Sequence, residues 1–265
     1  MAEPEESGSI RTRLGMVIAG LAILAGVGYA GWLWYASRPA ALPAPVVVAP
    51  APPAPKPQGP PPARFPIDSG ADSRLPSLAE SDGPWREAVT GVDGLLGLGR
   101  LLVTPGLIHN IVATVDALPR EKVARRVFPV EATPGRFRVG ANGTFGADNA
   151  RRYDPWMKMI RAVPPAQAAA VYRRFYPLFQ QAYRELGYPD GHFNDRLVEV
   201  IDDLLSTPET AFPIKVTAPG VMYQYADPAL ESLPIGQKML LRLGPANLSD
   251  VKAKLREFRK EIAGS

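Results

Sequence analysis

YRRFYPLFQQAYRELGYPDGHFNDRLVEVIDDLLSTPE, residues 172–209, is the stretch that decides the fold. Apolar residues recur in it at helical spacing, which predicts one helix over 167–186 and another over 193–204. Pro177 should kink or divide the first helix, and Gly187 should end it. The apolar stripe of that helix comprises Val171, Phe175, Leu178, Phe179, Ala182 and Leu186. We expect these two helices to form the core of a mainly α-helical domain.

Two more helices are predicted before this stretch. Ser81-Asp82 has the character of a helix start, and apolar residues follow it at helical spacing. Thr104-Pro105 then supplies an N-cap and a first helical residue for the next helix.

Short strands should interrupt the helices in two places. Residues 127–139 alternate apolar and polar side chains around Thr133-Pro134-Gly135, which suggests a minor β-hairpin. Residues 214–225 are rich in β-branched and aromatic side chains and are broken at Pro219-Gly220, so one or two short strands are expected there.

The chain closes with an amphipathic helix. Its expected core face comprises Leu248, Val251, Leu255, Phe258 and Ile262. Its cations elsewhere around the helix are Lys252, Lys254, Arg256, Arg259 and Lys260. We interpret these cations as an ordinary solvated surface, with membrane binding as the alternative.

Composition limits the classes of function. The 265 residues carry a formal net charge of +4 in a mixed pattern, so the sequence does not indicate a nucleic-acid-binding surface. The absence of cysteine excludes disulfides, thiol nucleophiles and thiolate metal ligands. No HExxH or GxSxG motif occurs, so neither a zinc protease nor an esterase is indicated, and no catalytic residue or cofactor is predicted.

Residues 14–35 predict a transmembrane helix. These 22 residues contain no Asp, Glu, His, Lys or Arg and would span about 33 Å as a helix. The run ends in Trp32, Trp34 and Tyr35, typical of a membrane interface and against the alternative of a cleaved signal peptide. Arg11 and Arg13 place the short N-terminus, residues 1–13, in the cytoplasm. The predicted location is therefore the inner membrane, single-pass, with the rest of the chain in the periplasm.

Small residues recur every fourth position within this segment, at Ala22, Gly26 and Ala30. Such a stripe lets two membrane helices approach closely, which suggests a homodimer. Ala and Gly are also ordinary constituents of membrane helices, and this alternative stays open.

A proline-rich stalk, residues 36–74, follows the membrane segment. Twelve prolines occur between Pro39 and Pro66, and proline fixes φ and removes backbone donors. We predict a disordered, extended spacer that reaches at most about 90 Å, with a ligand for a proline-binding module as the alternative. The remaining residues, 75–265, form the predicted soluble domain.

Four runs in this domain resemble a known family. They are LPSLAESD at 75–82, NARRYD at 149–154, the stretch 172–209 and YADPALESLPIGQKMLLRLGPANLSDVKAKL at 225–255. Together they are similar to the proteobacterial "domain of unknown function" family 3014. The resemblance implies an N-terminal membrane segment, a proline-rich linker and a helical domain. The family has no assigned activity, so no catalytic residue follows from it.

Arginines and tyrosines provide the preferred candidate for a ligand-binding groove. Arg151, Arg152 and Tyr153 open a predicted helix, where two guanidinium groups could hold a phosphate or a carboxylate. An aromatic wall would come from Tyr172, Tyr176, Tyr183 and Tyr188. The alternative is that these residues serve only the fold.

Four carboxylates provide a weaker candidate for a metal site. Asp195, Glu199, Asp202 and Asp203 lie on one side of the helix predicted over 193–204. Carboxylate oxygens are hard-cation ligands, but a solvated or arginine-paired helix face is the favoured interpretation. We therefore predict no metal.

These features predict an uncharacterised, noncatalytic envelope protein: a periplasmic binding or assembly module that contacts another envelope protein or the cell wall. One alternative is an enzyme acting on the cell wall or a glycan, which would need a cleft with opposed carboxylates. A passive structural spacer is the other.

Overall fold

The computed structural model describes residues 61–68, 74–92, 99, 101–102, 105–133, 135–220 and 222–263. All of them belong to one compact unit, Gln58–Ser265. The predicted N-terminus, the transmembrane helix 14–35 and the stalk as far as residue 60 lie outside the described residues. Within the described part of the chain, no helix is long and apolar enough to cross a membrane.

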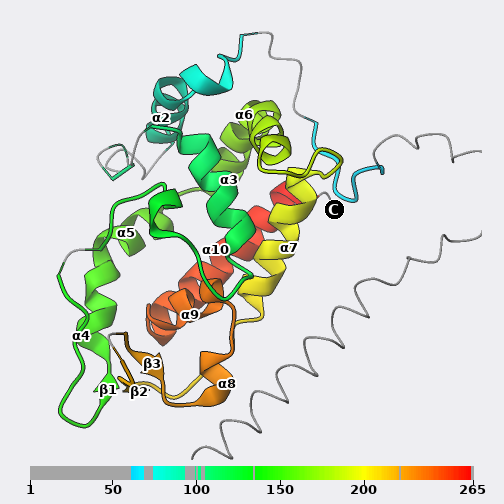
Figure 1. Cartoon of the computed structure of the whole chain (residues 1–265). Coiled ribbons are helices and arrows are strands. Elements are labelled where there is room, and N and C mark those ends of the chain that lie inside the picture. The colour runs from blue at the N-terminus through cyan, green and yellow to red at the C-terminus, as the bar shows by residue number, and fades with distance from the viewer. Residues whose placement is uncertain are drawn as a thin grey trace, which may run out of the picture. The chain divides into compact units, whose positions relative to one another are not determined.

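The domain is mainly α-helical, as predicted, with one small sheet (Figure 1). Its α-helices are α2 Asp82–Thr90, α3 Leu107–Ala117, α4 Ala147–Ala150, α5 Asp154–Ala162, α6 Pro165–Glu185, α7 Phe193–Leu205, α8 Pro228–Glu231, α9 Ile235–Leu241 and α10 Pro245–Ala263. The strands are β1 Thr144–Phe145, β2 Ile214–Thr217 and β3 Gln224–Tyr225. Short 3-10 helices lie at η1 Leu78–Glu80, η3 Arg125–Val127 and η4 Arg151–Tyr153.

The larger hydrophobic cluster is built around the aromatic face of α6. Phe179 stacks on Phe193 of α7 with ring centroids 5.6 Å apart, and Trp85 of α2 meets Phe175 and Phe179 edge-on at 5.2 and 5.1 Å. Such offset and edge-to-face pairs add to the free energy of burial. Helices α3 and α10 complete this cluster, so the two helices predicted as the core are confirmed as its centre.

Helix α6 continues through Pro177 and is not divided there. Proline removes one backbone hydrogen bond, but buried aromatic residues on both sides, Phe175 and Phe179, hold the helix against the core. The helix ends at Glu185, and Leu186 is 41% exposed. The expectation that Leu186 belongs to the buried stripe was therefore wrong, because the chain leaves the helix at that residue.

Helix α3 is capped by a carboxylate from another helix. Asp82, the first residue of α2, accepts hydrogen bonds of 2.8 Å from the backbone N–H groups of Gly106 and Leu107. The helix consequently begins at Leu107, after Gly106 with a φ of 81°, and not at Pro105 as predicted. Thr104 lies outside the described residues.

The β-hairpin predicted within 127–139 was wrong. Residues 125–127 form η3, and Val130 makes only an isolated bridge with Leu102. Phe137 and Val139 pack against a hydrophobic cluster without pairing as strands. Their alternation with polar residues reflects half-burial of an irregular segment, which the pattern alone does not distinguish from a strand.

The sheet forms instead from β1, β2 and β3, in that order and antiparallel. Phe145 pairs with Ile214, and Val216 pairs with Tyr225, so the strands expected within 214–225 are confirmed. The inward side of this sheet contributes to a second, smaller hydrophobic cluster together with Leu230, Leu241 and Leu248. Figure 1 shows the sheet and α8 at the opposite end of the domain from α6.

A buried carboxylate joins α3, α7 and the loop between α6 and α7. Asp116 is 4% exposed and accepts hydrogen bonds from Arg196 at 3.1 Å, from Tyr188 at 3.3 Å and from the Arg120 guanidinium. Arg196 also donates to the backbone carbonyl of Asp116 at 2.9 Å. Since a buried charge is costly unless it is paired, this network depends on all its members.

We predict that Asp116→Ala lowers the free energy of unfolding by about 3 kcal/mol, because it removes the buried acceptor that Arg196, Arg120 and Tyr188 share. The matched control is Asp250→Ala, which breaks an exposed pair with Arg161 and should cost less than about 1 kcal/mol. Urea unfolding followed by circular dichroism measures both. Equal losses would contradict the importance of the buried network.

Candidate functional site

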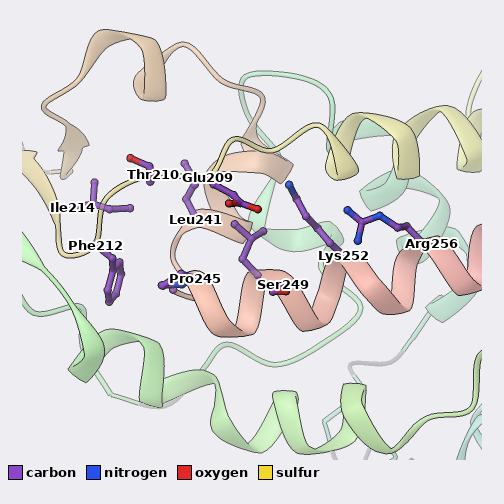
Figure 2. A pocket seen from close by; sticks show the side chains of 11 residues that line it. Glu209, Thr210, Phe212, Ile214, Leu241, Pro245, Ser249, Lys252 and Arg256 are labelled. Carbon is purple, nitrogen blue, oxygen red and sulfur yellow. The ribbon is translucent and has the colours of Figure 1, made fainter.

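A pocket of about 400 Å³ opens between α10, the end of α9 and the segment that leads from α7 to β2. Figure 2 shows Phe212 and Ile214 at one end of it and Lys252 and Arg256 at the other. Its volume lies in the range of small-molecule sites. We consider this pocket to be the candidate functional site.

The apolar wall of the pocket is the edge of the smaller hydrophobic cluster. Ile214, Leu241 and Leu248 belong to that cluster and are buried, and Phe212 packs against it. The Phe212 ring meets Phe145 edge-on, with centroids 6.1 Å apart. The wall is therefore fixed by the fold before any ligand binds.

Gly244 makes the turn that brings α10 under this wall. It lies shortly after the end of α9, and its φ is 81°, in the left-handed region that favours glycine. A Cβ at this position would also lie 3.3 Å from the Cβ of Ala150 and 3.4 Å from the Phe212 ring. Both constraints favour glycine at this position in the lining of the pocket.

One face of α10 lines the other side. Pro245, Ser249, Lys252 and Arg256 follow one another at spacings of three or four residues, and Leu248 lies four residues before Lys252, so they share a side of the helix. The character of this face changes from apolar at the N-terminal end to cationic one turn later. The pocket consequently has two chemically different ends.

Lys252 is the most unusual side chain in the pocket. It is only 8% exposed, and its ammonium donates a hydrogen bond to the backbone carbonyl of Thr207. An ammonium has three N–H donors, and Thr207 is its one hydrogen-bond acceptor among the described residues. Its other two N–H groups have no hydrogen-bond partner among the described residues, at a site where water is partly excluded.

Arg256 and Glu209 extend the polar end (Figure 2). Both are exposed, and neither has an ion pair or a side-chain hydrogen bond within the described part of the chain. With Lys252 they give the polar end a formal charge of +1, counting two cations and one carboxylate. This balance favours an anionic group on the ligand.

The sequence interpretation of α10 as a helix with solvated cations was wrong for Lys252. The local pattern places Lys252 on a second face of the helix, beside the apolar stripe, and the structure agrees with this placement. What buries Lys252 is the segment after α7, which crosses this second face at Thr207. That contact joins residues 45 positions apart, so helical periodicity gives no signal for it.

The predicted arginine–tyrosine groove is divided between two parts of the domain. Arg151 pairs with Asp148, and Arg152 donates to Thr133 and to the Gly135 carbonyl, both at 3.1 Å. These residues and Tyr153 lie at the junction of α4 and α5, well away from α6 in Figure 1. The arginines thus order the irregular segment before β1.

The four tyrosines of that groove pack in or against the larger cluster instead. Tyr172 and Tyr183 are buried, which raises the pKa of Tyr172 well above its usual value and that of Tyr183 to about 12. The Tyr172 hydroxyl donates to Asn194 at 3.1 Å, and the Tyr176 hydroxyl donates to Gln180 at 3.0 Å. Tyr188 takes part in the Asp116 network. Their hydroxyl groups therefore serve the fold.

The acidic residues of α7 each have a separate partner. Asp202 forms a bidentate pair with Arg259 at 2.6 and 2.9 Å, and Asp203 accepts from Gln237 at 2.9 Å. Glu199 lies between Arg196 and Arg64. Within the described residues, no group of three or more His, Asp or Glu side chains could hold a metal ion.

Asp195 fastens the end of the proline-rich segment to the domain. Its two carboxylate oxygens accept hydrogen bonds from the backbone N–H groups of Arg64 at 2.9 Å and Phe65 at 2.8 Å. Asn194 donates to the Phe65 carbonyl at 2.8 Å, and Arg64 pairs with Glu199 at 3.1 Å. We call residues 61–68 the docked linker.

The docked linker also makes apolar contacts. Phe65 and Ile67 pack against the larger cluster, and the guanidinium groups of Arg64 and Arg259 lie 5.5 and 5.9 Å from the Phe65 ring. Phe65 and Ile67 are the first apolar side chains larger than valine after residue 43, and this is the sequence signal for the contact. The ordered domain thus starts before residue 75, and the stalk predicted over 36–74 includes a segment that packs on it.

Comparison with known proteins gives a family but no activity. The family model described as "Protein of unknown function (DUF3014)" matches residues 107–259. This range includes the whole pocket, from Glu209 to Arg256. No curated protein and no solved structure matches the chain significantly.

We predict that Asp195→Ala accelerates tryptic cleavage of the Arg64–Phe65 bond by roughly tenfold or more, because two charge-assisted hydrogen bonds hold this bond against the domain. Mass spectrometry of timed digests of the full chain measures the rate. Asp190→Ala is the control, since it removes an exposed carboxylate without a partner in the described part of the chain. An unchanged rate in Asp195→Ala would contradict the docking.

Proposed function

The chain belongs to the DUF3014 family of proteins of unknown function, and from this premise we propose that it is a noncatalytic binding module whose ligand combines an anionic group with a short apolar part. The observation that carries the proposal is the position of Lys252, buried at the cationic end of a pocket whose other end is apolar. A carboxylate or a phosphate is the anionic group that such an end favours.

The apolar part of the ligand would lie against Phe212, Ile214 and Leu241. This wall is preformed, so binding would remove apolar surface from water without reorganising the core. The anion would take the free donors of Lys252 and those of Arg256. Selectivity among such ligands would then come from the distance between their anionic group and their apolar part.

A binding role accounts for the pocket better than the alternative of a cell-wall or glycan-directed enzyme. Paired-carboxylate hydrolysis needs two acidic side chains on either side of the reacting bond. Among the described residues that line the pocket, Glu209 is the single carboxylate and histidine is absent. A passive spacer, the other alternative, would need no pocket with one apolar and one cationic end.

The proposed setting follows from the N-terminal sequence. We propose that residues 14–35 anchor the chain in the inner membrane, with the N-terminus in the cytoplasm and the domain in the periplasm. The ligand group would then belong to an envelope protein or to the cell wall. A homodimer through Ala22, Gly26 and Ala30 is part of the same proposal.

We predict that hexyl phosphate binds the full chain in a neutral detergent, whereas hexanol and hexylammonium, which share its tail, bind at least tenfold more weakly. Isothermal titration calorimetry measures the three affinities. Equal binding of hexanol and hexyl phosphate would show that the cationic end is not used, and would overturn the proposal.

Two variants test the two ends of the pocket. Arg256→Gln should weaken hexyl phosphate binding by about tenfold, while Lys260→Gln, which removes an exposed charge from α10 outside the pocket, should change it less than twofold. Ser249→Phe should fill the pocket from an exposed helix position and abolish binding without altering the circular dichroism spectrum. If Arg256→Gln and Lys260→Gln have the same effect, the ligand lies elsewhere.

A further inference from the structure

The loop between β2 and β3 carries an exposed apolar tip. Met222 is 75% exposed and Tyr223 is 45% exposed, and Leu186 is the third such large apolar side chain among the described residues. A single exposed apolar residue is ordinary, but two neighbours at the end of a hairpin form a distinct surface. Neither residue lines the pocket described above.

The tip is held in place by the smaller cluster. The Tyr223 ring packs on Phe137 with centroids 5.5 Å apart, and Phe137 in turn packs on the buried Phe145 at 5.2 Å. Tyr223 is therefore anchored on one side and open to solvent on the other. Met222, its neighbour in the chain, has three-quarters of its surface exposed.

Two cations lie in the chain beside the residue on which the tip packs. Arg136 and Arg138 stand on either side of Phe137 and are exposed. Neither side chain has an ion pair or a hydrogen bond within the described residues. Lys215 is exposed on the outer side of β2 and does not belong to this surface. Two carboxylates of this end of the domain are engaged elsewhere: Asp148 pairs with Arg151, and Glu231 binds Lys238 and the amide of Tyr225.

We propose that this surface, Met222 and Tyr223 with Arg136 and Arg138, docks on the anionic lipid bilayer in which the chain is anchored. An exposed methionine can enter the lipid interface, tyrosine is typical of the headgroup level, and unpaired cations attract lipid phosphates. An acidic protein partner would fit the cations. Such a partner would have to supply its own groove for Met222, because the loop forms none.

This proposal rests on the membrane anchor of the proposed function. Two cations and two exposed apolar side chains give only a weak attraction to a bilayer, as single lipid anchors and short basic segments do. The anchor converts this weak attraction into an intramolecular one, because it keeps the tip at a high effective concentration near the lipid. The part of the predicted stalk before the docked linker, residues 39–60, would reach at most about 70 Å, which is long enough for the domain to touch the surface.

A fluorescent probe at position 222 tests the contact. The chain has no cysteine, so Met222→Cys can be labelled alone with a polarity-sensitive nitrobenzoxadiazole dye in the full-length protein. Leu186→Cys is the control site, because Leu186 is also an exposed apolar residue but follows α6, at the end of the domain that holds the larger cluster. Both proteins are reconstituted into vesicles of phosphatidylcholine with and without phosphatidylglycerol.

We expect the probe at 222, and not that at 186, to shift its emission to the blue and to be quenched by spin-labelled lipid only in the vesicles with phosphatidylglycerol. Arg136→Gln with Arg138→Gln should abolish this signal, whereas the matched pair Arg125→Gln with Arg126→Gln, also exposed, should keep it. Identical emission in both vesicle types would overturn the proposal. So would protection of the probe from aqueous iodide without lipid quenching, which would indicate a protein contact.

The anchor is tested separately in the same vesicles. A chain that an alkaline carbonate wash removes is not anchored, and that result would overturn the membrane part of the proposed function together with this inference. A chain that resists the wash but keeps a solvent-exposed probe at 222 would overturn this inference alone. Binding of hexyl phosphate in the pocket is independent of either outcome.

Discussion

The stacking of Phe179 on Phe193 is the contact on which the rest of the domain depends. It fixes α7 against α6, and the buried Trp85 and Tyr172 pack on the same Phe179 ring from other directions. Each of these aromatic side chains contributes on the order of 2 kcal/mol by leaving water. A helix of 21 residues with such a face can tolerate an internal proline, since tertiary packing and not local hydrogen bonding supplies most of its stability.

The candidate pocket depends on that contact indirectly. Once α7 is fixed, the chain leaves it at Ser206 and Thr207 along a definite path, and α10 is tied to the same path by Lys252. Gln237 of α9 binds Asp203 and Ser206 at 2.9 and 3.0 Å, so the third wall of the pocket is set by the end of α7 as well. The pocket is thus a consequence of how three helices meet, and its lysine is part of the joint.

How far the sequence predicts this structure depends on the range of the contact involved. The helices over 167–186 and 193–204 are predictable because their periodicity is local, and the face of Tyr172, Tyr176 and Tyr183 could have been assigned to the core, since they are spaced i, i+4 and i+11 beside Phe179. The cap that Asp82 gives to α3 and the burial of Lys252 come from residues 24 and 45 positions away. No spacing within one helix contains that information. The candidate site was missed for this reason, whereas the fold class was not.

The charges of the domain are arranged less evenly than their composition indicates. The acidic residues of α7 are used internally: Asp195 on the docked linker, Asp202 on Arg259 and Asp203 on Gln237. Because these carboxylates are already paired, positive charge stays without an acidic partner at two places among the described residues. These are the surroundings of Arg256 in the pocket and of Arg136 and Arg138 at the sheet. A net charge of +4 spread over mixed residues gives no sign of this, because it is the partnerships and not the counts that decide which charges face a ligand. Such internal pairing leaves two separate groups of cations without acidic partners among the described residues of a mildly basic domain.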